Sequence, residues 1–433
     1  MPTVILAPTG TQGDINPFLA VALALQKAGC RPVMAVMDDY CAGIAAQGVE
    51  VRAIRPGRRE IEADGHDDAS IARAVSSDLR AGLGIALPHL AASYLDLSAA
   101  MRGADVVVGG SLSTAARIAA EVAGLPLVTL VLQPMGFLSA AEPPLMSEAP
   151  WLRSVGQRCG RSAVRALYAL ASWRGRASLR PAIELRRRLG LAPLRDELID
   201  GPRRSERIVA MYPASFAPLA ADAPPQAISA GFAFHDGPPG VPLDAELDRF
   251  LRAGPPPIVF TLGSFVVHAP GDFFPASAAA ARRLGRRAVL LVGRHAVDRY
   301  RHLAGPDVAV AGHAPHSALL PRCAAVVHHG GIGTIAQALR AGILHLACPY
   351  FGDQFDNADR LVRLAVARSL ALRDYASGPA AAALAALLGD RRIIARADAL
   401  SGRMTAIDGP WVAAAEVARI ALRQSLPPLR RVG

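Results

Sequence analysis

The sequence predicts an α/β protein made of two doubly wound, Rossmann-like domains, each built on a parallel sheet. Two series of short apolar runs alternate with helical patterns, which is the organisation of βαβ units. Proline-rich pieces separate the two series, with DGPPGVPLD from Asp236 and AGPPP from Ala253. The length of 433 residues exceeds what one compact core usually contains and agrees with two domains.

The strands of the first series are predicted at 4–8, 31–37, 105–109 and 127–132, with helices at 17–28 and 114–123. The second series has predicted strands at 258–262, 288–292, 308–311 and 324–327, with a helix from 332. A last apolar helix is predicted at 411–422. We therefore divide the chain into an N-terminal domain (1–235), a linker (236–256), a second domain (257–405) and a C-terminal helical segment (406–433).

Composition favours a cytoplasmic protein that is soluble or peripheral to the inner membrane face. The five cysteines are odd in number and lack the paired spacing of a metal site, so a reducing compartment is expected. The N-terminus has the pattern of a strand and lacks a basic leader, so we expect no signal peptide. Arg117 and Glu121 interrupt the longest apolar stretch, so no transmembrane helix is expected.

The formal net charge of +11 comes almost wholly from arginine. Nucleic acid is not the expected partner, because aromatic interleaving, helix-turn-helix and zinc-finger spacings are missing from the sequence. Part of the charge is concentrated between Trp151 and Arg188. If that segment is one helix, its two faces are predicted to divide Arg158, Arg161 and Arg165 from Cys159, Leu167 and Leu170. A solvated surface helix is the simpler interpretation, and contact with anionic lipid or with an acidic acceptor is the alternative.

A glycine-rich turn follows the strand at 324–327, where the sequence reads HHGGIGT. Gly330, Gly331 and Gly333 permit backbone conformations and close approaches that a Cβ would block. The helix that begins at Ile332 adds unpaired N–H donors and a partial positive charge. With Thr334 and His329 beside it, the turn is suited to a diphosphate without a metal ion. An ordinary tight βα turn is the alternative for this segment taken alone.

The first βα turn, PTGTQGDINPF, contains a candidate base, Asp14. We expect Asn16 to cap the following helix and Pro17 to occupy its first position. A carboxylate near a helix N-terminus has its ionised form favoured, so Asp14 can accept a proton at neutral pH. A capping carboxylate without chemistry is the alternative.

The ordered blocks GHAPH (from Gly312), HHGGIGT and PYFGDQ (from Pro349) resemble the donor-sugar site of glycosyltransferase family 1, the UDP-glycosyltransferase superfamily. The resemblance implies the GT-B architecture, in which two doubly wound domains face each other, and a C-terminal helix that returns to the N-terminal domain. It assigns the base and ribose to His313, Ala314, His316 and Gln337. It assigns the diphosphate to Ser264, His329, Gly331, Gly333 and Thr334, the sugar hydroxyls to Asp353 and Gln354, and catalysis to Asp14 as general base.

Some positions depart from the pattern of this family. His313 stands where the family has a base-stacking tryptophan, His316 where it has glutamine, and Gln337 where it has a ribose-binding glutamate. The resemblance therefore does not favour UDP over dTDP. Plant relatives use a histidine oriented by an aspartate that follows the strand at 105–109, but this chain reads GGSLST there and has Asp14 in place of the histidine. An aspartate base does not need a partner to fix its tautomer.

Further segments are similar to the rhamnolipid rhamnosyltransferase group of that family. They include VVGGSLSTAARIAAEVAGLPLV, LSAAEPPL, YPASFAP and GVPLDAELDRFL. This resemblance implies transfer of rhamnose from dTDP-rhamnose to the hydroxyl of a hydroxyacyl lipid. An apolar acceptor groove is one interpretation, and core packing the other, for the large side chains Phe137, Leu138, Leu145, Met146 and Trp151.

We therefore expect an inverting, metal-independent glycosyltransferase that uses a dTDP- or UDP-sugar as cosubstrate, without a further cofactor, and a hydrophobic acceptor. UDP-glucose-dependent glucosylation of a polyketide, sterol or other small aglycone is the alternative within the enzyme class. A non-catalytic homologue that activates a partner enzyme is the alternative from another class.

Overall fold

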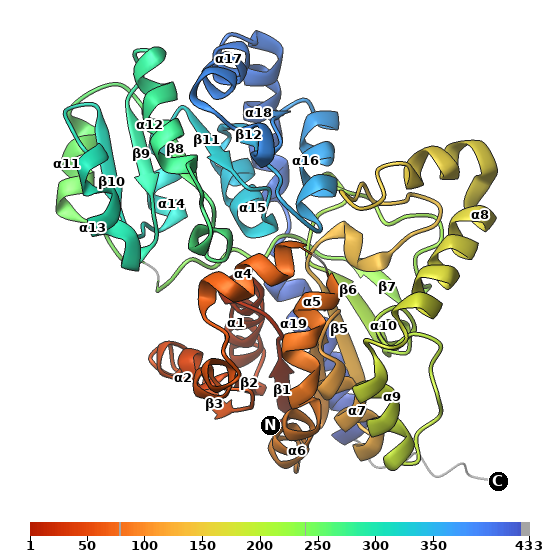
Figure 1. Ribbon diagram of the computed structural model, residues 1–433. Coiled ribbons are helices and arrows are strands. Elements are labelled where there is room, and N and C mark those ends of the chain that lie inside the picture. The colour runs from red at the N-terminus through yellow and green to blue at the C-terminus, as the bar shows by residue number, and fades with distance from the viewer. Residues whose placement is uncertain (78, 239, 426–433) are drawn as a thin grey trace.

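The computed structural model describes residues 1–77, 79–238 and 240–425, and these form two α/β domains (Figure 1). Each domain contains one parallel sheet with helices packed on it. The predicted fold class is confirmed. Among the described residues, none of the helices is both long and apolar enough to cross a membrane.

The first sheet has the strand order β3-β2-β1-β4-β5-β6-β7, so the order reverses between β1 and β4. In β1, Val4 lies beside Pro32 of β2 and Val106 of β4. The strands of this sheet are β1 (Thr3–Ala7), β2 (Arg31–Val36), β3 (Glu50–Ala53), β4 (Val106–Gly110), β5 (Leu127–Val131), β6 (Arg207–Ala210) and β7 (Ala227–Ser229). Its helices are α1 (Gln12–Lys27), α2 (Asp38–Ala45), α3 (Arg58–Ala63), α4 (Asp68–Ser77), α5 (Leu79–Ala86), α6 (Leu90–Ala100), α7 (Thr114–Ala123), α8 (Leu152–Gly175), α9 (Arg180–Arg188) and α10 (Asp200–Arg203).

The second sheet has the order β10-β9-β8-β11-β12-β13 and reverses between β8 and β11. Its strands are β8 (Ile258–Thr261), β9 (Ala288–Leu291), β10 (Val308–Ala311), β11 (Ala325–His328), β12 (Leu344–Ala347) and β13 (Ala367–Ser369). The helices of the C-terminal half are α11 (Ala245–Arg252), α12 (Phe273–Arg283), α13 (Val297–Tyr300), α14 (His316–Leu319), α15 (Ile332–Ala341), α16 (Gln354–Arg363), α17 (Ser377–Leu388), α18 (Arg391–Met404) and α19 (Gly409–Ser425).

The central strands are buried on both faces. All four residues of β8, for example, are buried. A strand covered by helices on both sides reads as a continuous apolar run instead of an alternating one. This burial explains why the apolar runs in the sequence located the central strands to within one or two residues.

The connection between the domains differs from the expected linker at 236–256. That interval contains α11, which begins where the Asp244 carboxylate accepts from the N–H of Glu246 at 2.9 Å. Leu247 and Leu251 then pack in one apolar cluster with Val259 of the second sheet. The interval therefore contributes an amphipathic helix to the core of the second domain, and proline content alone did not reveal it.

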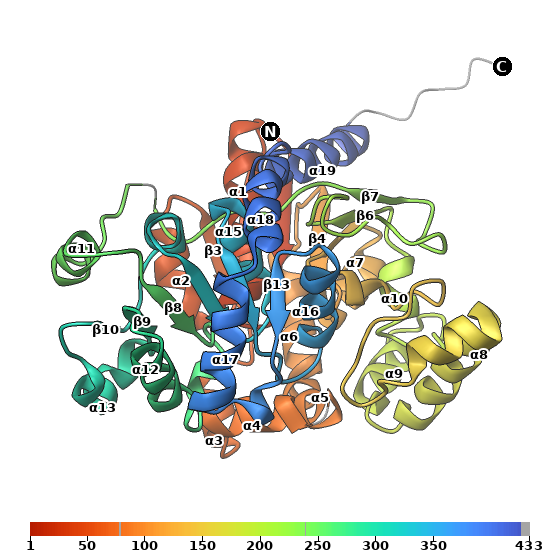
Figure 2. The same cartoon turned by 90° about the horizontal axis from the view of Figure 1, so that it is seen from above.

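The last helix, α19, lies against the first domain. Its alanines and Val417 share an apolar cluster with Phe18 and Leu25 of α1. Figure 2 shows α19 beside α1. An ion pair of 2.9 Å between Arg207 and Glu416 adds a polar contact to this packing. The chain therefore crosses from the second domain back to the first.

Helix α8 corrects the predicted basic face. Gly160 has φ 78° and ψ 174°, so the helix is broken there and Arg158 lies before the break. Leu167 packs with Val164, as expected for the apolar face, but Leu170 of the same predicted face is 46% exposed and Trp173 is 71% exposed. The break changes which side chains share a face, because the helical periodicity starts again after Gly160.

Candidate functional site

The predicted site residues follow the strands at which each sheet reverses its order. Asp14 follows β1, Ser264 follows β8, and His329 follows β11. Ligands of doubly wound sheets bind at the carboxyl ends of strands near such a reversal. Burial is the main cause of the raised pKa of Asp353, and the charge of Asp14 raises it further. The two carboxyl groups, one from each domain, therefore lie near enough to interact. The structure thus brings both halves of the predicted site to one place.

The start of α1 differs from the prediction. Thr11 is the N-cap and Gln12 the first helical residue, so Pro17 lies inside the helix and cannot donate to the carbonyl of Gly13. Asp14 is the third residue of the helix, and its Oδ2 accepts from the N–H of Thr11 at 2.9 Å. The sequence rule for proline at a helix start placed the helix five residues too late.

The Asp14 carboxylate packs against the backbone of Gly10, in the turn before α1. Gly10 has φ +132°, and a Cβ there would collide with the Asp14 carboxylate. Glycine therefore serves two purposes at this position, because it permits the backbone conformation and leaves space for the carboxylate.

Burial raises the pKa of Asp14 from its ordinary value of 3.8 to about 6, although hydrogen bonds from the N–H groups of Thr11 and Asp14 lower it. The sequence argument expected the helix N-terminus to favour the ionised form, but loss of solvent outweighs those donors. A pKa near 6 leaves the carboxylate mostly ionised at pH 7 and makes it a stronger base than an exposed aspartate.

The turn after β4 has no carboxylate to orient a base, as the sequence indicated. Ser113 occupies this turn instead, and its Oγ donates to the carbonyl of Ala7 at 2.7 Å. The same Oγ accepts from the N–H of Gly110 at 2.9 Å and from Thr9 Oγ1 at 3.2 Å. Ser113 therefore joins the carboxyl ends of β1 and β4 and supports the turn that leads to Asp14.

The His329 ring is enclosed by the two glycine-rich turns of the second domain. A Cβ at Gly263 or at Gly331 would collide with the imidazole. The residue is 8% exposed, and its Nδ1 is buried without a partner among the described residues. Burial is the main cause, and the nearby charge of His316 the smaller one, that lowers the pKa of His329 to about 4. At neutral pH the ring is therefore uncharged and can donate one hydrogen bond to a ligand.

The N-terminus of α15 supplies further donors. Gly331 is its N-cap and offers no side chain, so the first N–H groups of the helix lack a side-chain acceptor. Thr334 is buried in the first turn, Gly333 is exposed, and Ser264 is exposed on the turn after β8. Backbone N–H groups, a hydroxyl and a neutral imidazole at a helix N-terminus form a suitable environment for a diphosphate.

Asp353 precedes α16 and is held by a residue that the sequence argument overlooked. Asn357 Nδ2 donates to Asp353 Oδ2 at 2.7 Å and to the carbonyl of Gly330 at 3.1 Å. Burial raises the pKa of Asp353 to about 7, against the lowering effect of this hydrogen bond. The spacing of four residues between Asp353 and Asn357 was the available signal, since it places both on one helical face.

Gln354 differs from its neighbour, because its side-chain oxygen is already engaged. Oε1 accepts from the N–H groups of Tyr350 at 2.9 Å and Phe351 at 3.2 Å. The residue is 3% exposed. Gln354 therefore shapes the loop before α16, and only its amide nitrogen is left for the sugar contact that was predicted.

The predicted base and ribose residues contain unpaired buried polar atoms. His316 Nε2 and Gln337 Oε1 lack partners within the described part of the chain. Burial lowers the pKa of His316 to about 4, so its ring is neutral. His313 is exposed and Ala314 is buried. Buried polar atoms without partners are rare in folded proteins, so these two are suited to a ligand that supplies hydroxyl groups.

His328 has a structural role. The N–H of Gly330 donates to His328 Nδ1 at 3.1 Å, so the proton of the neutral ring is on Nε2. That nitrogen lies 3.1 Å from His345 Nδ1 and donates to it. Both rings are fully buried. The pair links β11 to β12 behind the glycine-rich turn.

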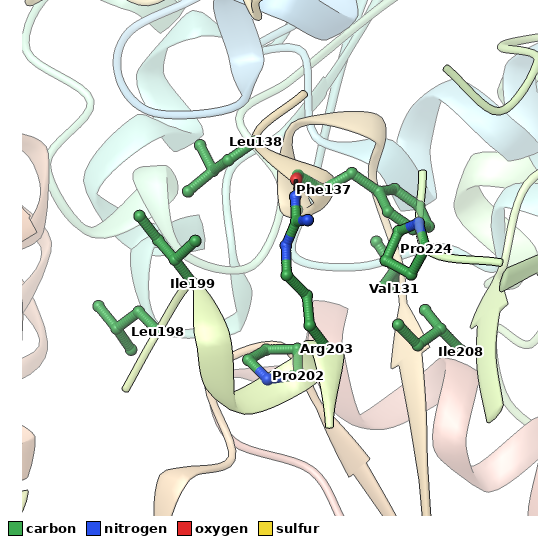
Figure 3. A pocket seen from close by; sticks show the side chains of 10 residues that line it. Val131, Phe137, Leu138, Leu198, Ile199, Pro202, Arg203, Ile208 and Pro224 are labelled. Carbon is green, nitrogen blue, oxygen red and sulfur yellow. Dashed lines mark hydrogen bonds between the residues drawn. The ribbon is translucent and has the colours of Figure 1, made fainter. Parts of the chain in front are cut away.

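The expected acceptor groove is not one continuous surface. Phe137 and Leu138 line a small hollow of about 20 Å³ in the first domain, together with Val131, Gly136, Leu198, Ile199, Pro202, Arg203, Ile208 and Pro224 (Figure 3). The Arg203 side chain extends across it and donates to the carbonyl of Phe137 at 3.4 Å. Met146 instead packs in a separate cluster under α8, and Trp151 is 51% exposed. Packing of the intervening chain separates residues that are close in sequence.

Comparisons with known proteins agree with this geometry. Residues 279–420 match the family described as Erythromycin biosynthesis protein CIII-like, C-terminal domain. The chain is 32% identical over 398 residues to O-mycaminosyltylonolide 6-deoxyallosyltransferase of Streptomyces fradiae, covering 84% of each protein. It belongs to the GT-B glycosyltransferase family. This glycosyltransferase is also 30% identical over 379 residues to vancomycin aglycone glucosyltransferase of Amycolatopsis orientalis, again with 84% of each covered.

Solved structures share the fold of this glycosyltransferase. The glycosyltransferase of kitacinnamycin has a TM-score of 0.70 at 21% identity, over 97% of this chain and 100% of that one. The spinosyn rhamnosyltransferase SpnG, complexed with thymidine diphosphate, has a TM-score of 0.64 at 22% identity, over 96% of this chain and 100% of that one. The chain is an enzyme of the natural-product glycosyltransferase type.

Proposed function

We propose that this glycosyltransferase transfers a deoxysugar, with rhamnose as first candidate, from a dTDP donor to a hydroxyl of a hydrophobic or lipid acceptor. The observation that carries the proposal is that Asp14, a carboxylate of raised pKa on the first domain, lies where its charge acts on Asp353 of the donor domain. A base on one domain and a sugar-binding carboxylate on the other suit a direct displacement between two bound substrates. The similar chains named as a deoxyallosyltransferase and a rhamnosyltransferase support a deoxysugar.

In the proposed reaction, Asp14 takes the proton of the acceptor hydroxyl while its oxygen attacks the anomeric carbon. The bond from that carbon to the diphosphate oxygen breaks, and the nucleoside diphosphate leaves with the electron pair. Attack opposite the leaving group inverts the anomeric centre. The N–H groups of α15, the Thr334 hydroxyl and His329 would stabilise the charge on the diphosphate. These donors would neutralise the diphosphate charge that a metal ion neutralises in other enzymes, so we propose that the transfer is metal-independent.

One observation removes a preference for UDP, and a second supports dTDP. His313 replaces a tryptophan that would cover more of the base, and it is exposed. The neighbour SpnG was solved with thymidine diphosphate. The second candidate function is glucosylation of a small aglycone from UDP-glucose, and the similarity to an aglycone glucosyltransferase favours it.

A donor and acceptor panel tests these two functions. The purified protein is incubated with dTDP-rhamnose or UDP-glucose, with a hydroxyacyl lipid or a polyketide aglycone, and with or without EDTA. Mass spectrometry then identifies the product. A rhamnosylated lipid formed equally in EDTA supports the proposal, and a glucosylated aglycone supports the second candidate. Binding of nucleotide sugar without any transfer, together with acceleration of a partner enzyme, would instead indicate a non-catalytic activator.

We further propose that the basic segment from Trp151 to Arg188 contacts an anionic membrane surface, where a lipid acceptor would be found. It contains ten arginines and one glutamate, a net charge of +9 within the +11 of the chain. After the break in α8, Arg161, Arg165, Trp173 and Arg176 are all exposed. An exposed aromatic residue flanked by arginines suits the interface of an anionic bilayer. Figure 1 shows α8 at the edge of the molecule.

Sedimentation with vesicles tests this contact. The protein should bind phosphatidylglycerol vesicles but not phosphatidylcholine vesicles, and roughly 0.5 M salt should release it. The double variant Arg161→Glu with Arg165→Glu should lose binding, whereas the exposed Arg299→Glu of the second domain should keep it. Equal sedimentation of both variants would argue against the contact.

A further inference from the structure

The two domains are joined by a cluster of charged contacts beside the proposed site. Arg153 of α8 pairs with Asp356 at 3.2 Å and with Asp359 at 2.8 Å, both on α16. From the same segment of the first domain, Glu142 pairs with Arg360 at 3.1 Å and with Arg363 at 3.3 Å. Each domain therefore contributes both an acid and a base to this contact.

The contact is buried at its centre. The Asp356 side chain is fully buried and that of Arg360 is 7% exposed. Asp356 accepts from Arg360 Nε at 2.8 Å, from the N–H of Leu145 at 3.1 Å and from Arg153. Burial alone would lower the pKa of Arg360, but Asp356 and Glu142 raise it above its ordinary value. Buried charges depend on their partners, so separation of the domains would leave Asp356 without two of its three donors.

Helix α16 connects this contact to the donor site. It is preceded by Asp353, and its Asn357 binds both Asp353 and the carbonyl of Gly330 in the glycine-rich turn. Asp356 is adjacent to Asn357 on the same helix. Whatever fixes Asp356 therefore also fixes the distance between Asp353 and the first domain, which carries Asp14.

We infer that Arg153 is a positioning residue that holds Asp353 opposite Asp14 when the two domains are together. The segment from Glu142 to Arg153 belongs to the first domain, which carries the proposed base Asp14, so the contact places the donor sugar relative to that base. This inference depends on the proposed roles of Asp14 and Asp353. Arg153 bonds to the carbonyl of Pro143 and to α16, and to none of the described residues of the diphosphate turn, so it acts on the transfer step and not on nucleotide binding.

Replacement of Arg153 by methionine tests the inference. Arg153→Met should lower kcat roughly tenfold or more, because small misplacements of reacting groups are costly. The dissociation constant for dTDP, measured by calorimetry, should change less than about twofold, because the nucleotide binds the second domain. Arg102→Met is the control in the first domain, since Arg102 is exposed, lies outside the basic segment and forms no ion pair among the described residues. It should leave both quantities unchanged.

Two further measurements separate this inference from the proposed function and from misfolding. Hydrogen exchange of the segment 139–153 should be faster in Arg153→Met, because Asp356, which accepts from the Leu145 N–H, is then held by Arg360 without Arg153. This readout needs no turnover. The milder Asp359→Asn should show the same split between kcat and nucleotide affinity, with an unchanged melting temperature. Wild-type kcat in both variants, or wild-type exchange in Arg153→Met, would overturn the inference. Loss of dTDP binding would overturn it too, because Arg153 would then support the nucleotide site.

Discussion

Replacement of Asp14 by asparagine separates the proposed base from a capping carboxylate. Asparagine keeps the size of the side chain and can still accept from the Thr11 N–H, so the start of α1 should remain intact. It cannot accept the proton of an acceptor hydroxyl. We expect transfer to fall at least about a hundredfold, the usual contribution of a general base. Nucleotide affinity should not change, because Asp14 lies on the other domain.

The same replacement should stabilise the fold at neutral pH. Burial raises the pKa of Asp14 from 3.8 to about 6, a change of about two units that corresponds to about 3 kcal/mol. Because the folded-state pKa is above the unfolded one, the stability linked to protonation of Asp14 is fully present below about pH 4. It is lost as pH rises through about 6. Asparagine is never ionised, so Asp14→Asn should be more stable than the wild type at pH 7 by up to about 3 kcal/mol.

The pH profile gives an independent check on the same residue. A base with a pKa near 6 predicts that kcat/KM of the wild type falls tenfold per pH unit below about pH 6, while an exposed aspartate would remain active to about pH 4.

Rates can be followed by chromatography of released dTDP, and stability by urea unfolding. Asp298→Asn is a suitable control, since Asp298 is an 88% exposed surface carboxylate of the second domain. The reasoning would be refuted by an Asp14→Asn enzyme that keeps more than a tenth of the wild-type rate.

Other residues of the site give further predictions. His329→Ala should raise the dissociation constant for dTDP roughly tenfold, the effect of one hydrogen bond to a charged group, while the exposed His302→Ala should not change it in the same calorimetric titration. Gly331→Ala should weaken dTDP binding to a similar extent, because its Cβ displaces the His329 ring. The double variant with His329→Ala should bind dTDP no more weakly than either single variant. Additive losses of affinity would mean that the two residues act separately. Asn357→Ala should lower the free energy of unfolding by about 1–3 kcal/mol, measured with urea, because the Gly330 carbonyl and Asp353 lose their shared donor. Unchanged stability together with unchanged turnover would show that these two hydrogen bonds are unimportant.

Local patterns were sufficient for the central strands, the fold class and the place of the donor turn, whereas β3, β6, β7 and β13 were not predicted. Parallel strands buried on both faces leave continuous apolar runs, such as 258–262. The turn that packs against the His329 ring requires glycine at position 331, because a Cβ there would collide with the ring. Both constraints act over a few residues, so the chain records them directly. The predicted start of α1 was wrong because the rule for proline is only a preference. Pro17 inside the helix costs the hydrogen bond to the Gly13 carbonyl, and the rest of the fold outweighs this cost.

Contacts between segments that are far apart in the chain were decided by the tertiary structure alone. Asp14 and Asp353 are separated by more than three hundred residues, and the charges that pair Arg153 with α16 by about two hundred. The pKa of Asp14 depends on how much solvent the folded chain removes around it, and its direction was therefore predicted wrongly from the helix N-terminus alone. Burial and long-range pairing are properties of the packed molecule. For that reason the sequence revealed which groups carry the chemistry, and the folded structure showed how strongly each is perturbed and what holds it in place.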